Sequence, residues 1–145
     1  MASVSEQMTH DHRECDEIYA KAEETIAAGD FEEGLALWSD FSARVEQHFT
    51  LEEETLFPSF EAATGMRAGP TMVMRGEHLQ MREMLKSITA AIENQDMDDA
   101  LGLCESLMIF MQQHNMKEEQ VLYPMLNDAL PKEETEQQVS QVLAV

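Results

Sequence analysis

Apolar residues recur every three or four positions along most of the chain, the spacing that places them on one face of an α-helix. Short polar turns and turns containing glycine or proline interrupt this pattern. It predicts helices over residues 3–28, 31–58, 71–93 and 97–129. β-branched residues are sparse, whereas Glu, Ala, Leu, Met and Gln are abundant, so the predicted fold class is all-α.

Residues that cap helices stand at the predicted boundaries. Ser3 and Glu6 have the spacing of a capping box, Gly29 ends the first helix, and Asp30 caps the second. We expect Pro58 to kink or end the second helix, because proline lacks an amide donor and its ring crowds the preceding turn.

The chain repeats itself after 66 residues, without a gap. The pattern Gln-His-x-x-x-Glu-Glu-x-x-Leu-aromatic-Pro occurs at residues 47–58 and again at 113–124, and the same shift places His12 on His78. Each repeat is predicted to be an αα-hairpin that cannot bury its apolar face alone. Two docked hairpins make an up-and-down four-helix bundle over residues 1–130. The tail, 131–145, is expected to be a short packing helix or a frayed end.

Six polar residues interrupt the apolar stripes of the predicted helices. They are His12, His48, Glu52, His78, His114 and Glu118. Each His-x-x-x-Glu pair lies on one helix face, one turn apart, as two ligands of one site must. Core histidines without a ligand role are the alternative. It would have to hold for two His–Glu pairs and two further histidines, all related by one shift.

Charge balance favours a metal site on these stripes. An ionised carboxylate in a core is costly unless it is paired or coordinates a metal. The basic residues nearest Glu52 and Glu118, Arg44 and Lys117, fall off the stripes. Six ligands with two carboxylates suit two metal ions, each held by two histidines and joined by the glutamates. Iron, zinc and manganese all accept such mixed ligands.

The remaining candidate residues have plainer interpretations. Glu53 and Glu119 lie about 100° around the helix from the glutamates before them, so they are expected to be solvated or to support the ligands. His10 is expected on the surface. Cys15 and Cys104 make no disulfide framework and are expected in the core, with Cys15 one turn from His12.

A ferritin-like site is excluded by spacing. Such a site needs Glu-x-x-His motifs. The residues three positions before the five histidines are Gln7, Thr9, Val45, Arg75 and Met111, and none is glutamate.

A formal charge of −20 argues against binding to nucleic acid or to an anionic membrane surface, both of which need a basic face. The N-terminus lacks a basic segment followed by an apolar one, and no apolar run approaches about 18 residues. We therefore expect a soluble, cytoplasmic protein that has neither nucleic acid nor membrane as a partner.

The doubled motif, with His12 and His78, resembles the hemerythrin-like (HHE cation-binding) domain over about residues 5–130. The resemblance implies an up-and-down bundle with an oxo- or hydroxo-bridged di-iron centre. In it, His12 and His48 would bind one iron, His78 and His114 the other, and Glu52 and Glu118 would bridge them.

One difference from the oxygen-carrying members of that family argues against reversible oxygen carriage. Oxygen-carrying hemerythrins have a fifth histidine one turn from another on the third helix, whereas the residues one turn either side of His78 are Met74 and Arg82. The set is more similar to the four-histidine, two-glutamate domains of iron–sulfur-cluster repair and nitric-oxide-response proteins.

Two functions follow from the resemblance. The centre is expected to bind or sense oxygen, nitric oxide or the iron and redox state. Alternatively, it is an enzyme that acts on peroxide or nitric oxide or supplies iron for cluster repair. A third possible function is that of an iron buffer. The expected partner is a small diatomic molecule or peroxide. Zinc or manganese are possible substitutes for iron.

Overall fold

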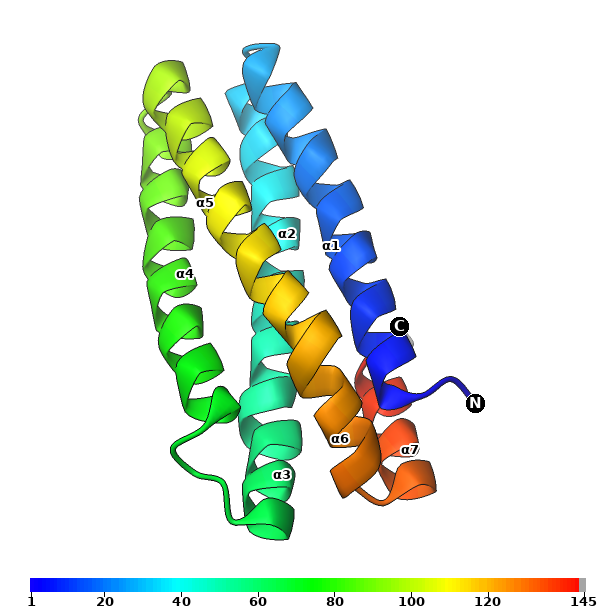
Figure 1. Ribbon diagram of the computed structural model, residues 1–145. Coiled ribbons are helices and arrows are strands. Elements are labelled where there is room, and N and C mark those ends of the chain that lie inside the picture. Colours follow the sequence, from blue (N-terminus) through cyan, green and yellow to red (C-terminus); the bar gives the residue numbers. More distant parts are fainter. Residues whose placement is uncertain (144–145) are drawn as a thin grey trace.

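The computed structural model describes residues 1–143, which form an all-α, up-and-down bundle (Figure 1). The elements are α1 (Val4–Ala27), α2 (Phe31–Leu51), η1 (Glu52–Leu56), α3 (Phe57–Thr64), α4 (Pro70–Glu93), α5 (Met97–Lys117), η2 (Glu118–Leu122), α6 (Tyr123–Ala129) and α7 (Lys132–Leu143). Adding 66 to the bounds of α1, α2 and η1 gives those of α4, α5 and η2. The two hairpins therefore repeat in structure as they do in sequence.

The predicted caps are present. The Ser3 side chain accepts a hydrogen bond from the amide of Glu6, whose carboxylate accepts from the Ser3 amide in return. The Asp30 side chain accepts from the amide of Glu33 at the start of α2. Gly29, with φ of 86°, adopts the left-handed conformation that ends a helix and that glycine tolerates best.

Pro58 does not end the second helix, which continues as α3 to Thr64. The turn before it, η1, is a π-helix in which the Phe57 amide donates to the carbonyl of Glu52, five residues back. In an α-helix the proline ring would clash with the carbonyl four residues before it, that of Glu54. The wider π turn accommodates the ring, so the chain continues past it.

The second hairpin uses the same device. In η2 the Tyr123 amide donates to the carbonyl of Glu118, and the helix continues through Pro124 to Ala129. Such π turns are rare in proteins and occur often at functional sites. Here each begins at one of the two glutamates on the apolar stripes.

The helix pairs α1/α2 and α4/α5 pack as hairpins, and α2 against α4 and α1 against α5 close the bundle. The tail forms α7, which packs against α1 and α2 at one end of the bundle and buries Val139 (Figure 1). Its last two residues, 144 and 145, lie outside the described residues. None of the described helices is long and apolar enough to cross a membrane.

The core divides into two apolar clusters. The Trp38 cluster includes Tyr19, Trp38, Phe41, Val45, Phe49, Met81, Leu85, Cys104, Leu107 and Met111. The Phe57 cluster includes Met8, Leu51, Leu56, Phe57, Phe60, Met74, Leu122, Tyr123, Leu126 and Val139. On α1, α2 and α4 the stripe histidine stands between residues of the two clusters, and His114 stands between Met111 on α5 and Leu122 on η2. The polar residues are thus enclosed by apolar side chains above and below.

Candidate metal centre

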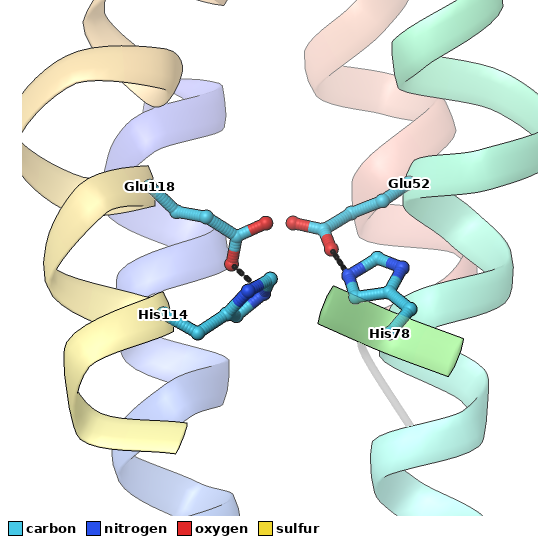
Figure 2. Close-up of side chains that lie close together, drawn as sticks. All are labelled: Glu52, His78, His114 and Glu118. Carbon is cyan, nitrogen blue, oxygen red and sulfur yellow. Dashed lines mark ion pairs between the residues drawn. The ribbon is translucent and has the colours of Figure 1, made fainter. Parts of the chain in front are cut away.

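The bundle brings the six stripe residues together. His12, His48, His78 and His114 come from α1, α2, α4 and α5, and Glu52 and Glu118 are the first residues of η1 and η2. All six are buried, with no more than 5% of any of them exposed. Figure 2 shows the carboxylates of Glu52 and Glu118 facing each other across the middle of the bundle.

The Nε2 atoms of all four histidines face these two carboxylates. The distances are 3.2 Å from His12 to Glu118, 3.4 Å from His48 to Glu52, 3.0 Å from His78 to Glu52 and 3.3 Å from His114 to Glu118. Each glutamate therefore contacts one histidine from each hairpin. This is the arrangement that lets a carboxylate join two neighbouring sites.

The Nδ1 atoms face outward, and each meets a further carboxylate. The pairs are His12 with Glu119 at 2.7 Å, His48 with Asp11 at 2.8 Å, His78 with Glu53 at 2.6 Å and His114 with Glu77 at 2.8 Å. An Nδ1–H that donates to a carboxylate leaves the Nε2 lone pair free and turned inward. Metal-bound histidines are usually oriented in this way.

The outer carboxylates are also related by the 66-residue repeat, because Asp11 corresponds to Glu77 and Glu53 corresponds to Glu119. Glu53 and Glu119 support the histidines of the opposite hairpin. Asp11 and Glu77 support the histidines of their own hairpin, and neither role was predicted from the sequence. An acidic residue directly before the stripe histidine in each repeat was the available signal.

Basic side chains neutralise three of these outer carboxylates. Asp11 pairs with Arg44, Glu53 with Arg82 and Glu77 with Lys117. Among the described residues, no lysine or arginine pairs with Glu52 or Glu118. Around the centre, the lysine and arginine side chains therefore pair only with the outer carboxylates. The polar groups that contact Glu52 and Glu118 are the four histidines, Tyr123 and, as Figure 2 shows, the other glutamate.

These surroundings raise the pKa values of three histidines of the centre. Burial by itself would lower the pKa of His48, but Glu52 and Asp11 outweigh burial and raise it to about 10. The pKa values of His12 and His114 are also raised against burial, through Glu118. Without a metal, these raised pKa values favour protons on His12, His48 and His114, which supply positive charge next to the carboxylates.

Four inward donor atoms have no hydrogen-bond partner among the described residues. They are Glu52 Oε1, His78 Nε2, His114 Nε2 and Glu118 Oε2. His78 Nε2 lies 3.0 Å from Glu52 Oε1, but the two atoms lack the alignment of a hydrogen bond. Buried nitrogen and oxygen atoms are costly without partners, and a cation among them removes that cost. The donor set thus fits a metal ion.

The donors gather into two groups that share Glu118. Glu52, His78, His114 and Glu118 each offer one atom, all within 4.8 Å of one another, and so do His12, His48 and Glu118. Two imidazoles with carboxylate oxygens are a usual ligand set for a transition metal.

The other candidate residues are placed as follows. The side chain of His10 is 71% exposed and pairs with Glu14, in agreement with the prediction. Cys15 and Cys104 are buried and free, and burial raises the pKa of each thiol to about 12, so both stay protonated. Cys15 also lines a cavity of about 10 Å³ beside His12 and His48.

An all-α bundle that encloses histidines and carboxylates in this way defines a class of helical cation-binding domains. The chain matches the family model of the hemerythrin HHE cation binding domain over residues 3–126, and it belongs to that family. Comparison with curated proteins and with solved structures gives no match.

Proposed function

We propose that this protein binds two iron ions in the middle of its bundle. His12 and His48 hold one ion, His78 and His114 hold the other, and Glu52 and Glu118 bridge them. The observation that carries this proposal is the pair of buried histidine–glutamate groups that share Glu118. In one of them, Glu52, His78, His114 and Glu118 each have an inward atom without a hydrogen-bond partner. Zinc and manganese accept the same donors and are the substitutes to test against iron.

The centre is proposed to bind or sense a small ligand. Six protein ligands do not fill the coordination shells of two iron ions, so positions remain for an outside molecule. The cavity beside His12 and His48 is lined by Val45, Phe49 and Met111, and its volume of about 10 Å³ suits a molecule the size of water. Oxygen, nitric oxide and peroxide have two non-hydrogen atoms and are only somewhat larger than water, whereas organic substrates are far larger.

Metal content is the first test. Protein produced with iron supplied should contain about two irons per chain and show oxo-bridge charge-transfer bands after exposure to air. Parallel loading with zinc and manganese should show whether iron is preferred. Protein that stays colourless and takes up none of the three metals would refute the proposal.

Rapid mixing separates binding from catalysis. The reduced, iron-loaded protein is mixed anaerobically with oxygen, nitric oxide or peroxide, and its spectrum is followed. A stable adduct that is reversed by removing the ligand supports binding or sensing. Repeated turnover without loss of iron would instead establish an enzyme that acts on peroxide or nitric oxide. Transfer of iron to an apo iron–sulfur protein would indicate cluster repair.

A further inference from the structure

The hydroxyl group of Tyr123 lies inside the proposed two-metal site. Its Oη is 2.7 Å from Glu52 Oε2, 2.9 Å from Glu118 Oε1, 3.0 Å from His48 Nε2 and 3.1 Å from His12 Nε2. The residue is completely buried. One oxygen atom is therefore in contact with four of the six proposed ligands.

This contact belongs to only one half of the repeat. Position 123 corresponds to position 57, where the chain has Phe57, which has no hydroxyl group. The Phe57 ring stacks on His78 with centroids 5.9 Å apart, as the Tyr123 ring stacks on His12 at 5.6 Å. The two rings occupy related places, so the hydroxyl group is the chemical difference between the two halves of the centre.

The spacing of the donors fits a shared metal ion. Metal–nitrogen and metal–oxygen bonds of about 2.1 Å, at right angles, place neighbouring donors about 3 Å apart. Oη stands at that distance from the two imidazole nitrogens, and His12 Nε2 is 3.2 Å from Glu118 Oε1. His78 and His114 form no hydrogen bond with the tyrosine.

We infer that Tyr123 is a seventh protein ligand, bound through its phenol oxygen to the ion held by His12 and His48. The inference rests on the proposed function, which it deepens. As the metal–oxygen bond forms, the O–H bond breaks and the proton leaves to the buffer. The two ions are then chemically different, since only one has an anionic phenolate ligand.

A phenolate is a hard, anionic donor and stabilises iron(III) more than iron(II). Tyr123 therefore makes the ion of the first hairpin the more difficult of the two to reduce. It also occupies one of the positions at that ion, next to the cavity.

Phenolate bound to iron(III) has a visible charge-transfer band, and resonance Raman excitation in that band enhances tyrosine ring vibrations. The chain has only two tyrosines, which makes the assignment simple. The control is Tyr19→Phe, because the Tyr19 hydroxyl donates to Glu23 at 2.6 Å and lies in the Trp38 cluster. Iron-loaded wild type and Tyr19→Phe should show the tyrosine modes, and Tyr123→Phe should lose them while it keeps two irons.

Metal analysis of the same samples separates this inference from the proposed function. Two results would overturn the tyrosine ligand alone. In one, wild type contains two irons per chain but shows no tyrosine modes. In the other, the modes persist in Tyr123→Phe. In that case the phenol is only a hydrogen-bond donor in the centre. Absence of bound metal in wild type would overturn both proposals.

A second measurement covers a variant that does not fold. Wild-type protein produced with ring-deuterated tyrosine should show a shift of the enhanced modes, and unshifted modes would exclude tyrosine as their source. The reduction potential gives an independent reading. Tyr123→Phe should be easier to reduce than wild type, whereas Tyr19→Phe should match it.

Discussion

Asp11 accepts a hydrogen bond from Nδ1 of His48 across the α1–α2 interface, at 2.8 Å and out of contact with solvent. The carboxylate is held on its other side by Arg44, whose Nε donates to it at 2.8 Å. A histidine constrained in this way keeps its Nε2 turned toward the centre before any metal arrives. The outer carboxylates therefore have consequences for metal affinity that can be measured.

Replacement of Asp11 by asparagine should weaken metal binding. Loss of such a supporting carboxylate typically lowers metal affinity about 10–100-fold. Competition with a chelator measures the change in affinity for iron(II) or zinc. Asp40→Asn is the matched control, since Asp40 is exposed on α2. Equal affinities for the two variants would contradict a role for Asp11 in orienting His48.

Substitution of a buried histidine and of an exposed histidine should have different effects on metal content. His48→Ala should lose bound metal, because it removes a buried inward donor, whereas His10→Ala should retain it, because His10 is exposed. Elemental analysis of both variants after the same iron loading gives the metal content. A similar loss in both would show that the helix faces are wrongly assigned.

Removal of the metal should make stability depend on pH in a defined direction. The pKa of His48 in the folded chain is about 10, above the value near 6.5 expected when unfolded. The folded state thus binds more protons between these values, and its free energy of unfolding falls as pH rises from about 6.5 to about 10. Denaturant unfolding of metal-free protein at pH 6, 8 and 10 measures the change. A stability that rises over this window would be the contrary result.

Because the same histidines bind protons, metal affinity should change with pH in the opposite direction to the free energy of unfolding. A bound metal displaces protons from His12, His48 and His114, so the apparent metal affinity should increase over that pH window. Calorimetry at pH 8 in buffers of different ionisation enthalpy counts the protons released. No release would mean that the histidines are neutral before metal binds.

Gly34 on α2 and Gly102 on α5 give a paired test of helix packing away from the histidines. A Cβ at Gly34 would lie 2.8 Å from Cγ1 of Ile26, whereas one at Gly102 would meet no atom within 4 Å. Crowding of this kind costs about 1–3 kcal/mol, and alanine gains about 1 kcal/mol in helix propensity.

We therefore expect Gly34→Ala to lower the free energy of unfolding by on the order of 1 kcal/mol and Gly102→Ala to raise it by about the same amount. Urea unfolding of the metal-free variants measures both. Stabilisation by Gly34→Ala would show that Ile26 moves aside without cost.

Much of this protein follows from one property of its sequence, the 66-residue repeat laid over a helical apolar pattern. The repeat indicates two hairpins, and the pattern shows which polar residues face inward. The fold and the gathering of His48, Glu52 and their partners could be predicted because each depends only on the position of a residue around its own helix.

Other features depend on contacts between helices. Asp11 is adjacent to His12 in sequence, yet its carboxylate serves His48 on the next helix, and Glu53 serves His78 in the other hairpin. Tyr123, which looks like an apolar motif residue, places its hydroxyl group among the buried histidines and glutamates. Helical periodicity assigns a face to a side chain but does not say which atom of a neighbouring helix it meets.

The passage of the chain through Pro58 shows the same limit in the backbone. The expectation for proline considers an α-helix alone, in which the ring has no room. Here η1 adds a wider turn at Glu52, and the apolar residues on either side, Leu56 and Phe60, remain buried in the core. The sequence by itself thus determined the bundle and its inward polar residues. Tertiary packing decided how the helices pass their prolines and which carboxylate or hydroxyl group meets each histidine, because these depend on the relative placement of separate helices.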